Sequence, residues 1–216
     1  MTRACFLLFP ILLMAGVTSA ETALEALEKK AAAGDAEAQF SVGAAYDQGT
    51  GVTKDPRKAA EWFEKAAAQG MAKAQFNIGT MCENGVGVPK DEKKAIEWYE
   101  KSAAQGFPDA QFNLAGMYAS GHGVPKDAMK AAEWYEKAAM KGFARAQFNL
   151  GLMYLAGQGV PKDEIRSYAW FTVAAADGDP SARTNRAYFD KKMPKEKKEA
   201  GRKLAQELIA KIQKAQ

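Results

Sequence analysis

The chain has few of the residue types on which disulfide-stabilised proteins and histidine-based metal sites depend. Its 216 residues include two cysteines and one histidine. Cys5 lies in the N-terminal apolar run, so that only Cys82 is left once this run is removed, and no intramolecular disulfide can form. A single histidine, His122, excludes a metal site built from several histidines. We therefore expect a protein that is stabilised by packing and holds no metal.

Motifs for nucleophilic catalysis and for phosphate binding are also missing. The sequence contains no Ser-x-x-Lys, Ser-Asp-Asn or Lys-Thr-Gly, the motifs that supply a serine nucleophile and its base in penicillin-binding proteins. The stretch GHGVPKD, 121–127, lacks the glycine spacing of nucleotide-binding loops. A triad of Ser120, His122 and Asp127 has no second support in the sequence. We expect no catalytic residue and no cofactor, and hence a protein that is not an enzyme.

A long hydrophobic run occurs only at the N-terminus. Arg3 is followed by an apolar run over 5–17 and by small residues up to Ala20, which is the three-part pattern of a secretory signal peptide. The run is shorter than the roughly 20 residues of a membrane span. We expect a signal peptide over 1–20, cleaved after Ala20, no transmembrane segment in the mature chain, and a periplasmic or secreted location. A retained N-terminal anchor is the alternative.

The formal net charge of +4 hides a division along the chain. Residues 21–182 hold 18 Lys and Arg against 22 Asp and Glu, whereas residues 183–216 hold 11 against 4. A basic tail of this kind can bind an anionic surface such as peptidoglycan, and it can equally be the solvated face of a helix. Both interpretations stay open at this stage.

The sequence does contain a strict period of 36 residues. The motif Ala-Gln-Phe recurs at 38–40, 74–76, 110–112 and 146–148. A tryptophan recurs at the same interval, as Trp62, Trp98, Trp134 and Trp170. Four copies without an insertion indicate a repeat architecture.

Each copy predicts two helices. In the first, for example 144–156, apolar residues recur every four positions and form one stripe. In the second, for example 127–141, Asp127 is suited to cap the N-terminus, and Trp134 and Tyr135 fall on the packed side. Because the tryptophans keep their period on such a face, we interpret them as core residues rather than as a stacking surface for sugars or bases.

A helical hairpin of this size cannot bury its apolar stripe alone, so successive hairpins are expected to stack. Gly151 stands in the middle of a predicted first helix, which indicates the close approach of a neighbouring helix. The predicted organisation is a signal peptide (1–20), an N-terminal capping helix (21–34), four helical-hairpin repeats (35–178), and a degenerate fifth repeat with a basic C-terminal capping helix (179–216).

The repeated unit resembles the Sel-one-like repeat (SLR), a relative of the tetratricopeptide repeat. The resemblance covers about residues 22–192 and rests on the pattern A-x-x-N-L-G-x-M-Y-x-x-G-x-G-V-x-K-D-x-x-K-A-x-E-W-x-x-K-A-A-x-x-G, nearly complete in 110–142 and 142–178. It implies an all-α, right-handed α-solenoid of stacked helical hairpins that binds proteins or peptides as an adaptor or scaffold of the bacterial envelope. A cysteine-rich subgroup of secreted SLR proteins, linked to weak β-lactamase activity, has a cysteine pair in each repeat, which this chain lacks.

One polar column on the first helices is the candidate binding site. The residue after each Ala-Gln-Phe, with its counterpart in the degenerate repeat, is Ser41, Asn77, Asn113, Asn149 and Asn185. This column lies off the apolar stripe, so packing alone does not demand asparagine. In tetratricopeptide relatives the matching asparagine bonds the backbone of a bound peptide, which implies this role for Asn77, Asn113 and Asn149. The alternative, that they bond the neighbouring repeat, stays open.

Two neighbouring columns complete the predicted groove. One varies between repeats: Ala44, Thr80, Gly116 and Leu152. The other holds Met81, Met117 and Met153, which serve either as an adaptable floor or as core. We predict a monomeric, non-enzymatic protein that binds a protein or peptide ligand in the concave groove, and no nucleic acid. The alternative function is binding of peptidoglycan or weak hydrolysis of β-lactams.

Overall fold

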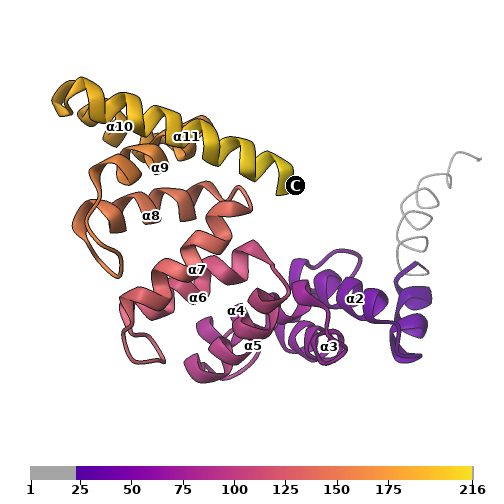
Figure 1. The fold of residues 1–216 in the computed structure, drawn as a ribbon. Coiled ribbons are helices and arrows are strands. Elements are labelled where there is room, and N and C mark those ends of the chain that lie inside the picture. Colours follow the sequence, from indigo (N-terminus) through magenta and orange to yellow (C-terminus); the bar gives the residue numbers. More distant parts are fainter. Residues whose placement is uncertain (1–22, 216) are drawn as a thin grey trace, which may run out of the picture. The chain divides into compact units, whose positions relative to one another are not determined.

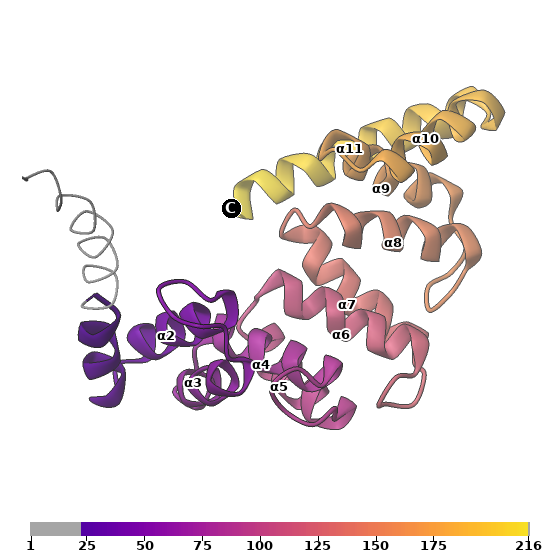
Figure 2. The same ribbon diagram turned by 180° about the vertical axis from the view of Figure 1, so that it is seen from behind.

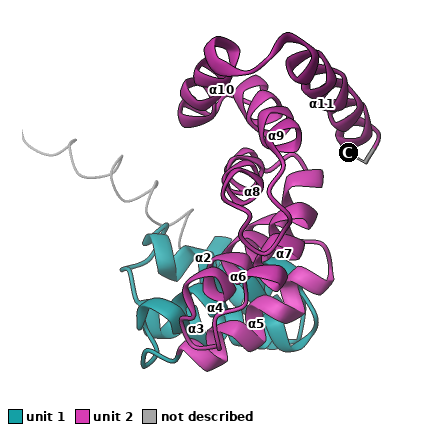
Figure 3. Cartoon of the chain, turned by 60° about the vertical axis from the view of Figure 1, so that its left-hand side comes forward, with its two compact units in different colours: residues 1–91 teal, residues 92–216 magenta. Residues whose placement is uncertain are grey.

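The described part of the chain consists of helices joined by short loops (Figure 1). The computed structural model describes residues 23–215 and divides into two compact units, one ending at Asp91 and the other beginning at Glu92 (Figure 3). Among the described residues there is no strand, and none of their helices is long and apolar enough to span a membrane. The predicted signal peptide, with its cleavage site at Ala20, lies outside the described residues.

Helices of 13 residues recur in both units. Unit 1 contains a helical segment over 23–32 and three helices of 13 residues: α2 (Ala36–Gln48), α3 (Pro56–Ala68) and α4 (Ala72–Asn84). Unit 2 contains α5 (Glu92–Ala104), α6 (Pro108–Ser120), α7 (Ala128–Met140), α8 (Ala144–Ala156), α9 (Glu164–Ala176) and α10 (Pro180–Lys192), each of 13 residues, and α11 (Lys195–Ala215), of 21 residues. Consecutive helices pack on one another from α2 to α4 in unit 1 and from α5 to α10 in unit 2, which confirms the predicted all-α class of stacked helical hairpins.

Aspartates begin the second helices of the hairpins, as predicted. Asp55, Asp127 and Asp163 each accept hydrogen bonds from the N–H groups two and three residues later, at 2.9–3.2 Å. The N–H of Asp127 also donates to the Tyr118 carbonyl at 2.9 Å, which closes the loop. Gly121 ends α6 with a left-handed backbone, which glycine adopts without strain. The stretch 121–127 is therefore a connector between two helices.

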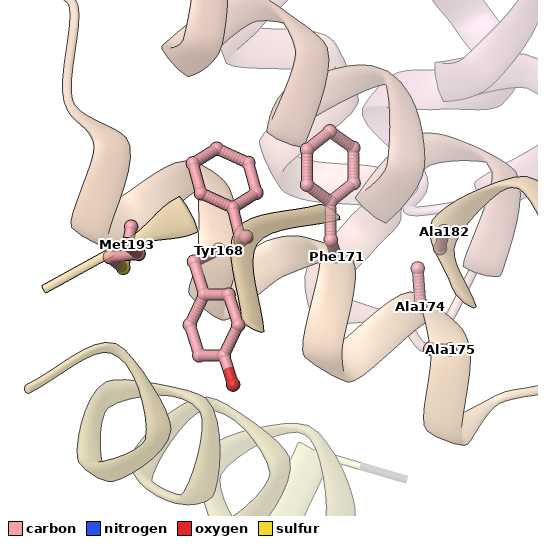
Figure 4. Packing of buried hydrophobic residues seen from close by; sticks show 7 residues of the cluster. Tyr168, Phe171, Ala174, Ala175, Ala182 and Met193 are labelled. Carbon is pink, nitrogen blue, oxygen red and sulfur yellow. The ribbon is translucent and has the colours of Figure 1, made fainter. Parts of the chain in front are cut away.

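The two helices of a hairpin approach each other at a glycine. A Cβ atom on Gly151 of α8 would stand 2.8 Å from the ring of Phe171 in α9, and one on Gly43 of α2 would stand 2.8 Å from the ring of Phe63 in α3. Both rings are buried, and Phe171 lies in a cluster with Tyr168 (Figure 4). The close approach predicted at Gly151 is confirmed.

The residue that follows each tryptophan in sequence is a buried aromatic. The residues at this position, Phe63, Tyr99, Tyr135 and Phe171, are all buried. Of the tryptophans only Trp170 is buried; Trp62, Trp98 and Trp134 are half-buried. Over each of these three rings lies a lysine Nζ, 3.7–4.1 Å from the centroid, from Lys65, Lys101 and Lys137. The interpretation of all four tryptophans as core residues is wrong for these three, which stand at the edge of the packed face where a cation covers them.

A buried glutamine joins each first helix to the helix before it. The glutamines of the Ala-Gln-Phe motifs, Gln39, Gln75, Gln111 and Gln147, are at most 6% exposed. Each Nε2 donates at 3.0–3.3 Å to an alanine carbonyl eight residues earlier, in the last turn of the preceding helix. Carbonyls in a last turn have no partner within their own helix. The glutamine supplies that partner and so fixes how one hairpin follows the next.

In the later connecting loops the second glycine touches the preceding repeat. A Cβ on Gly159 would overlap the carbonyl oxygen of Ala128, and one on Gly87 would overlap that of Pro56. Both glycines also have a positive φ. Their recurrence in the sequence therefore reflects a contact between repeats as well as a turn.

The last two helices both pack on α9 (Figure 2). The Tyr168 hydroxyl of α9 donates to Asp190 of α10 at 2.9 Å and accepts from Arg202 of α11 at 3.2 Å. Lys197 of α11 pairs with Glu164 of α9 at 2.9 Å. Basic residues of the tail thus help to hold α11 against its neighbours, which favours a structural interpretation of its charge.

Replacing Gly151 by alanine should destabilise the protein, although alanine is the better helix former. Overpacking against the buried Phe171 ring costs typically 1–3 kcal/mol, which outweighs about 1 kcal/mol gained in helix propensity. Gly116→Ala is the matched control, because its Cβ would meet only the Tyr135 hydroxyl, at 3.8 Å. Urea unfolding should show Gly151→Ala less stable, and Gly116→Ala at least as stable, as the parent. A stabilised Gly151→Ala variant would contradict the close approach.

The aromatic pair of one hairpin provides a second test. Phe171→Ala should lower the free energy of unfolding by about 3–5 kcal/mol, because it empties a fully buried site. Trp134→Ala should lower it by clearly less, since its ring is half-buried under Lys137. If thermal and urea unfolding showed equal losses for the two variants, the assignment of the core aromatic would be wrong.

Candidate functional site

Two equivalent hollows lie on the first helices, one in each unit. The unit 1 hollow, of about 210 Å³, is lined by Asp47, Phe63, Phe76, Asn77, Thr80, Met81, Asn84 and Val86. The unit 2 hollow, of about 340 Å³, is lined by Ala119, Lys126, Ala128, Tyr135, Asn149, Leu152, Met153 and Gln158. Six of these positions correspond across an interval of 72 residues, which is two repeats. The same part of the hairpin therefore forms both hollows.

The hollows bring together the three columns that the sequence singles out. Asn77 and Asn149 represent the polar column, and Thr80 and Leu152 represent the variable one. Met81 and Met153 also line the hollows. They are only 6% and 7% exposed, so they are chiefly core residues, and their exposed atoms form the floor of each hollow. Asn113 lines neither hollow.

Tyrosine hydroxyls engage two of the asparagines. Nδ2 of Asn113 donates to the Tyr99 hydroxyl at 3.1 Å, and Asn149 hydrogen-bonds to the Tyr135 hydroxyl. In both pairs the tyrosine stands 14 residues earlier, in the preceding second helix. These bonds join neighbouring repeats, so at Asn113 and Asn149 the geometry favours the structural alternative over a free peptide-binding amide.

For the two remaining asparagines, Asn77 and Asn185, the residue 14 positions earlier is phenylalanine instead of tyrosine. Phe63 precedes Asn77 by 14 residues, and Phe171 precedes Asn185 by the same interval. Asn185 donates instead to the Ser181 carbonyl of its own helix, at 3.0 Å. The Asn77 side chain makes no hydrogen bond with any residue in the described range, so its amide is available to a ligand.

Ser41, the first member of the column, is engaged locally. Its hydroxyl donates to the Glu37 carbonyl one turn earlier in α2, at 2.8 Å. Together with the asparagine pairings, this bond divides the column: Asn77 is available, whereas the other members are bonded within the protein.

Burial raises the pKa of the Tyr135 hydroxyl above its ordinary value of 10.0, and its side-chain hydrogen bond with Asn149 opposes this rise in part. The buried hydroxyl is therefore held in its neutral form.

The side chains around His122 are engaged with the backbone. Ser120 Oγ donates to the Gly116 carbonyl at 2.9 Å, and the Asp127 carboxylate caps α7. His122 itself is exposed. The arrangement contains no bonded serine, histidine and aspartate of the kind that a triad needs. Among the described residues no group of three or more His, Cys, Asp or Glu side chains is placed to hold a metal ion.

A comparison with protein families identifies the repeat. The model of the Sel1 repeat matches four consecutive stretches, 36–71, 72–107, 108–143 and 144–179. The chain belongs to the Sel1 repeat family. The Sel1 model therefore confirms the resemblance drawn from the 36-residue pattern, and it spans most of the described helices.

Solved structures of other Sel1 repeat proteins are similar in fold and sequence. A protective antigen with an SLR fold from uropathogenic Escherichia coli is 38% identical, with a TM-score of 0.75 over 77% of this chain and 36% of that one. A Sel1 repeat protein from Oxalobacter formigenes is also 38% identical, with a TM-score of 0.70 over 76% of this chain and 47% of that one. The chain thus spans between a third and a half of these relatives.

A more distant structure shares only the helical fold. The immunity protein Pa5087 of Pseudomonas aeruginosa is 21% identical, with a TM-score of 0.50 over 90% of this chain and 74% of that one. No curated protein matches the sequence. Sel1 repeat proteins generally mediate protein–protein interactions. Membership of the family therefore indicates a binding role in general terms.

Tyr135→Phe tests the pair that engages Asn149. Removing the hydroxyl should lower the free energy of unfolding at pH 7 by about 0.5–1.5 kcal/mol. Because the folded pKa is raised, the neutral hydroxyl contributes stability that is complete below pH 10 and is lost as the pH rises through the folded pKa. Urea unfolding from pH 7 to above pH 10 should thus show a shallower decline for the variant. Tyr188→Phe, at a residue 62% exposed, is the control. An identical decline in parent and Tyr135→Phe would contradict this description of the site.

Proposed function

We propose that the chain is a non-enzymatic binding scaffold that holds an extended segment of a partner protein or peptide against the first helices of its repeats. The pair of equivalent hollows carries this proposal. They share an asparagine and a methionine floor, whereas their rims differ: Asp47, Thr80 and Val86 in unit 1 correspond to Ala119, Leu152 and Gln158 in unit 2. A constant scaffold with variable rims is how a repeat protein selects among partners.

The size of the unit 1 hollow supports a peptide rather than a small metabolite. The unit 1 hollow, at about 210 Å³, is smaller than the roughly 300–1,000 Å³ of small-molecule pockets, and it suits a single side chain. The free Asn77 amide offers both a donor and an acceptor beside that hollow, which suits a peptide backbone. In unit 2 the same role requires Asn149 to exchange its bond with Tyr135 for one with the ligand.

The envelope is the proposed location, and its support is the signal-peptide pattern over 1–20. Binding of peptidoglycan through the basic tail is the alternative from another class. The pairing of Lys197 with Glu164 and of Arg202 with Asp190 supports a structural use of that charge instead.

Selection of short peptides from a displayed library on the purified mature chain tests the function. Peptides that bind should lose about 5- to 20-fold in affinity for Asn77→Ala, the value of one or two peptide-backbone hydrogen bonds. Lys65→Ala, on the second helix of the same unit, is the control and should bind as the parent does. Circular dichroism would confirm that both variants remain folded. Selected peptides that bind Asn77→Ala and the parent equally would contradict the placement of the site.

A further inference from the structure

We propose that the unit 1 hollow is selective for a lysine or arginine side chain of the bound segment, and that the equivalent unit 2 hollow is not. This inference rests on the proposed function and specifies the chemistry of the partner. It follows from the atoms that line the two hollows.

The unit 1 hollow offers hydrogen-bond acceptors and one negative charge. The Asp47 carboxylate makes no hydrogen bond or ion pair with any residue in the described range, and the Asn77 amide is equally available. Asn84 uses its Nδ2 on the Thr80 carbonyl at 2.9 Å, which leaves its oxygen as an acceptor. None of the described residues that line this hollow is cationic. An ammonium or guanidinium group, which only donates, matches such a rim.

The walls of the same hollow are apolar. Phe76, Met81 and Val86 line it, and Val86 is 43% exposed although it is a large hydrophobic residue. A lysine or arginine side chain places its methylene stem on surface of this kind while its charged head reaches a polar rim. A short acidic side chain would leave Val86 uncovered and would meet the charge of Asp47. The combination of apolar wall and acidic rim therefore selects long cationic side chains.

The unit 2 hollow provides an internal comparison. At the position of Asp47 it has Ala119, and at the position of Thr80 it has Leu152. Its lining also includes Lys126, an exposed cation. With a positive charge and no carboxylate, this hollow disfavours lysine and arginine. The same backbone thus presents opposite charge preferences in the two units.

Blocked short peptides that differ in one central residue test this selectivity. The central residue would be Lys, Arg, Met, Gln or Glu, within an otherwise identical sequence taken from the peptides selected on the parent chain. Isothermal titration should show the Lys and Arg peptides binding about 5- to 20-fold more tightly than the Gln peptide, the range between an exposed ion pair and a charge-assisted hydrogen bond. The preference should weaken with added salt.

Two matched variants locate the charge that produces the preference. Asp47→Asn should abolish the difference between the Lys and Gln peptides, whereas Glu64→Gln, which removes the same charge from α3 of the same unit, should preserve it. The variant Ala119→Asp with Lys126→Ala should add a second site for the Lys peptide in unit 2. A preference that survived Asp47→Asn would overturn the inference.

The remaining outcomes separate this inference from the function on which it rests. Peptides that bind with dependence on Asn77 but without preference for Lys or Arg would overturn the selectivity and leave the binding function intact. If no peptide of the series bound at all, both would fall.

Discussion

The close approach of the two helices of a hairpin, seen in α2–α3 and in α8–α9, is the contact on which the packing of these hairpins depends. An aromatic ring of the second helix lies where a side chain of the first would stand, as Phe63 does against Gly43 and Phe171 against Gly151. This contact sets the distance between the helices and buries the ring. At the equivalent position α6 has the buried Ala115 in place of glycine, so the hairpins share helix length without sharing one identical contact. Stacking of like hairpins then extends one core through each unit.

The aromatic position also links the core to the binding surface. Where it holds tyrosine, at Tyr99 and Tyr135, the hydroxyl is hydrogen-bonded to the asparagine 14 residues later. Where it holds Phe63, that asparagine is left available at the surface. At Asn77 the absence of one oxygen atom in the core thus leaves the amide available, whereas Asn185, which follows Phe171, bonds to its own helix. Repeats with nearly the same sequence acquire different surfaces in this way, without any change of fold.

Much of the fold follows from the sequence, because its features are local and repeated. The period of 36 residues, the capping aspartates and the mid-helix glycine each act within one hairpin, and the structure confirms the hairpins. The tryptophans were misplaced because a period does not say which of two adjacent aromatics points inward; Tyr135, not Trp134, does so. The buried role of Gln147 was missed, although the glutamine is in every motif, because its partner carbonyl is visible only once two helices are placed. Its recurrence in each Ala-Gln-Phe was the available signal.

The candidate site was predictable as a set of columns, but the state of each residue in it was not. The asparagines look equivalent in sequence, and only the arrangement of the preceding helix distinguishes Asn77 from Asn113.

Chemical-shift mapping of the isotope-labelled chain during titration with a selected peptide tests the central claim most directly. We predict that the largest changes fall in the 76–86 and 149–158 segments, and that the indole signals of Trp98 and Trp134 stay in place. Changes centred on those indoles or on α11, with the first helices unaffected, would contradict it.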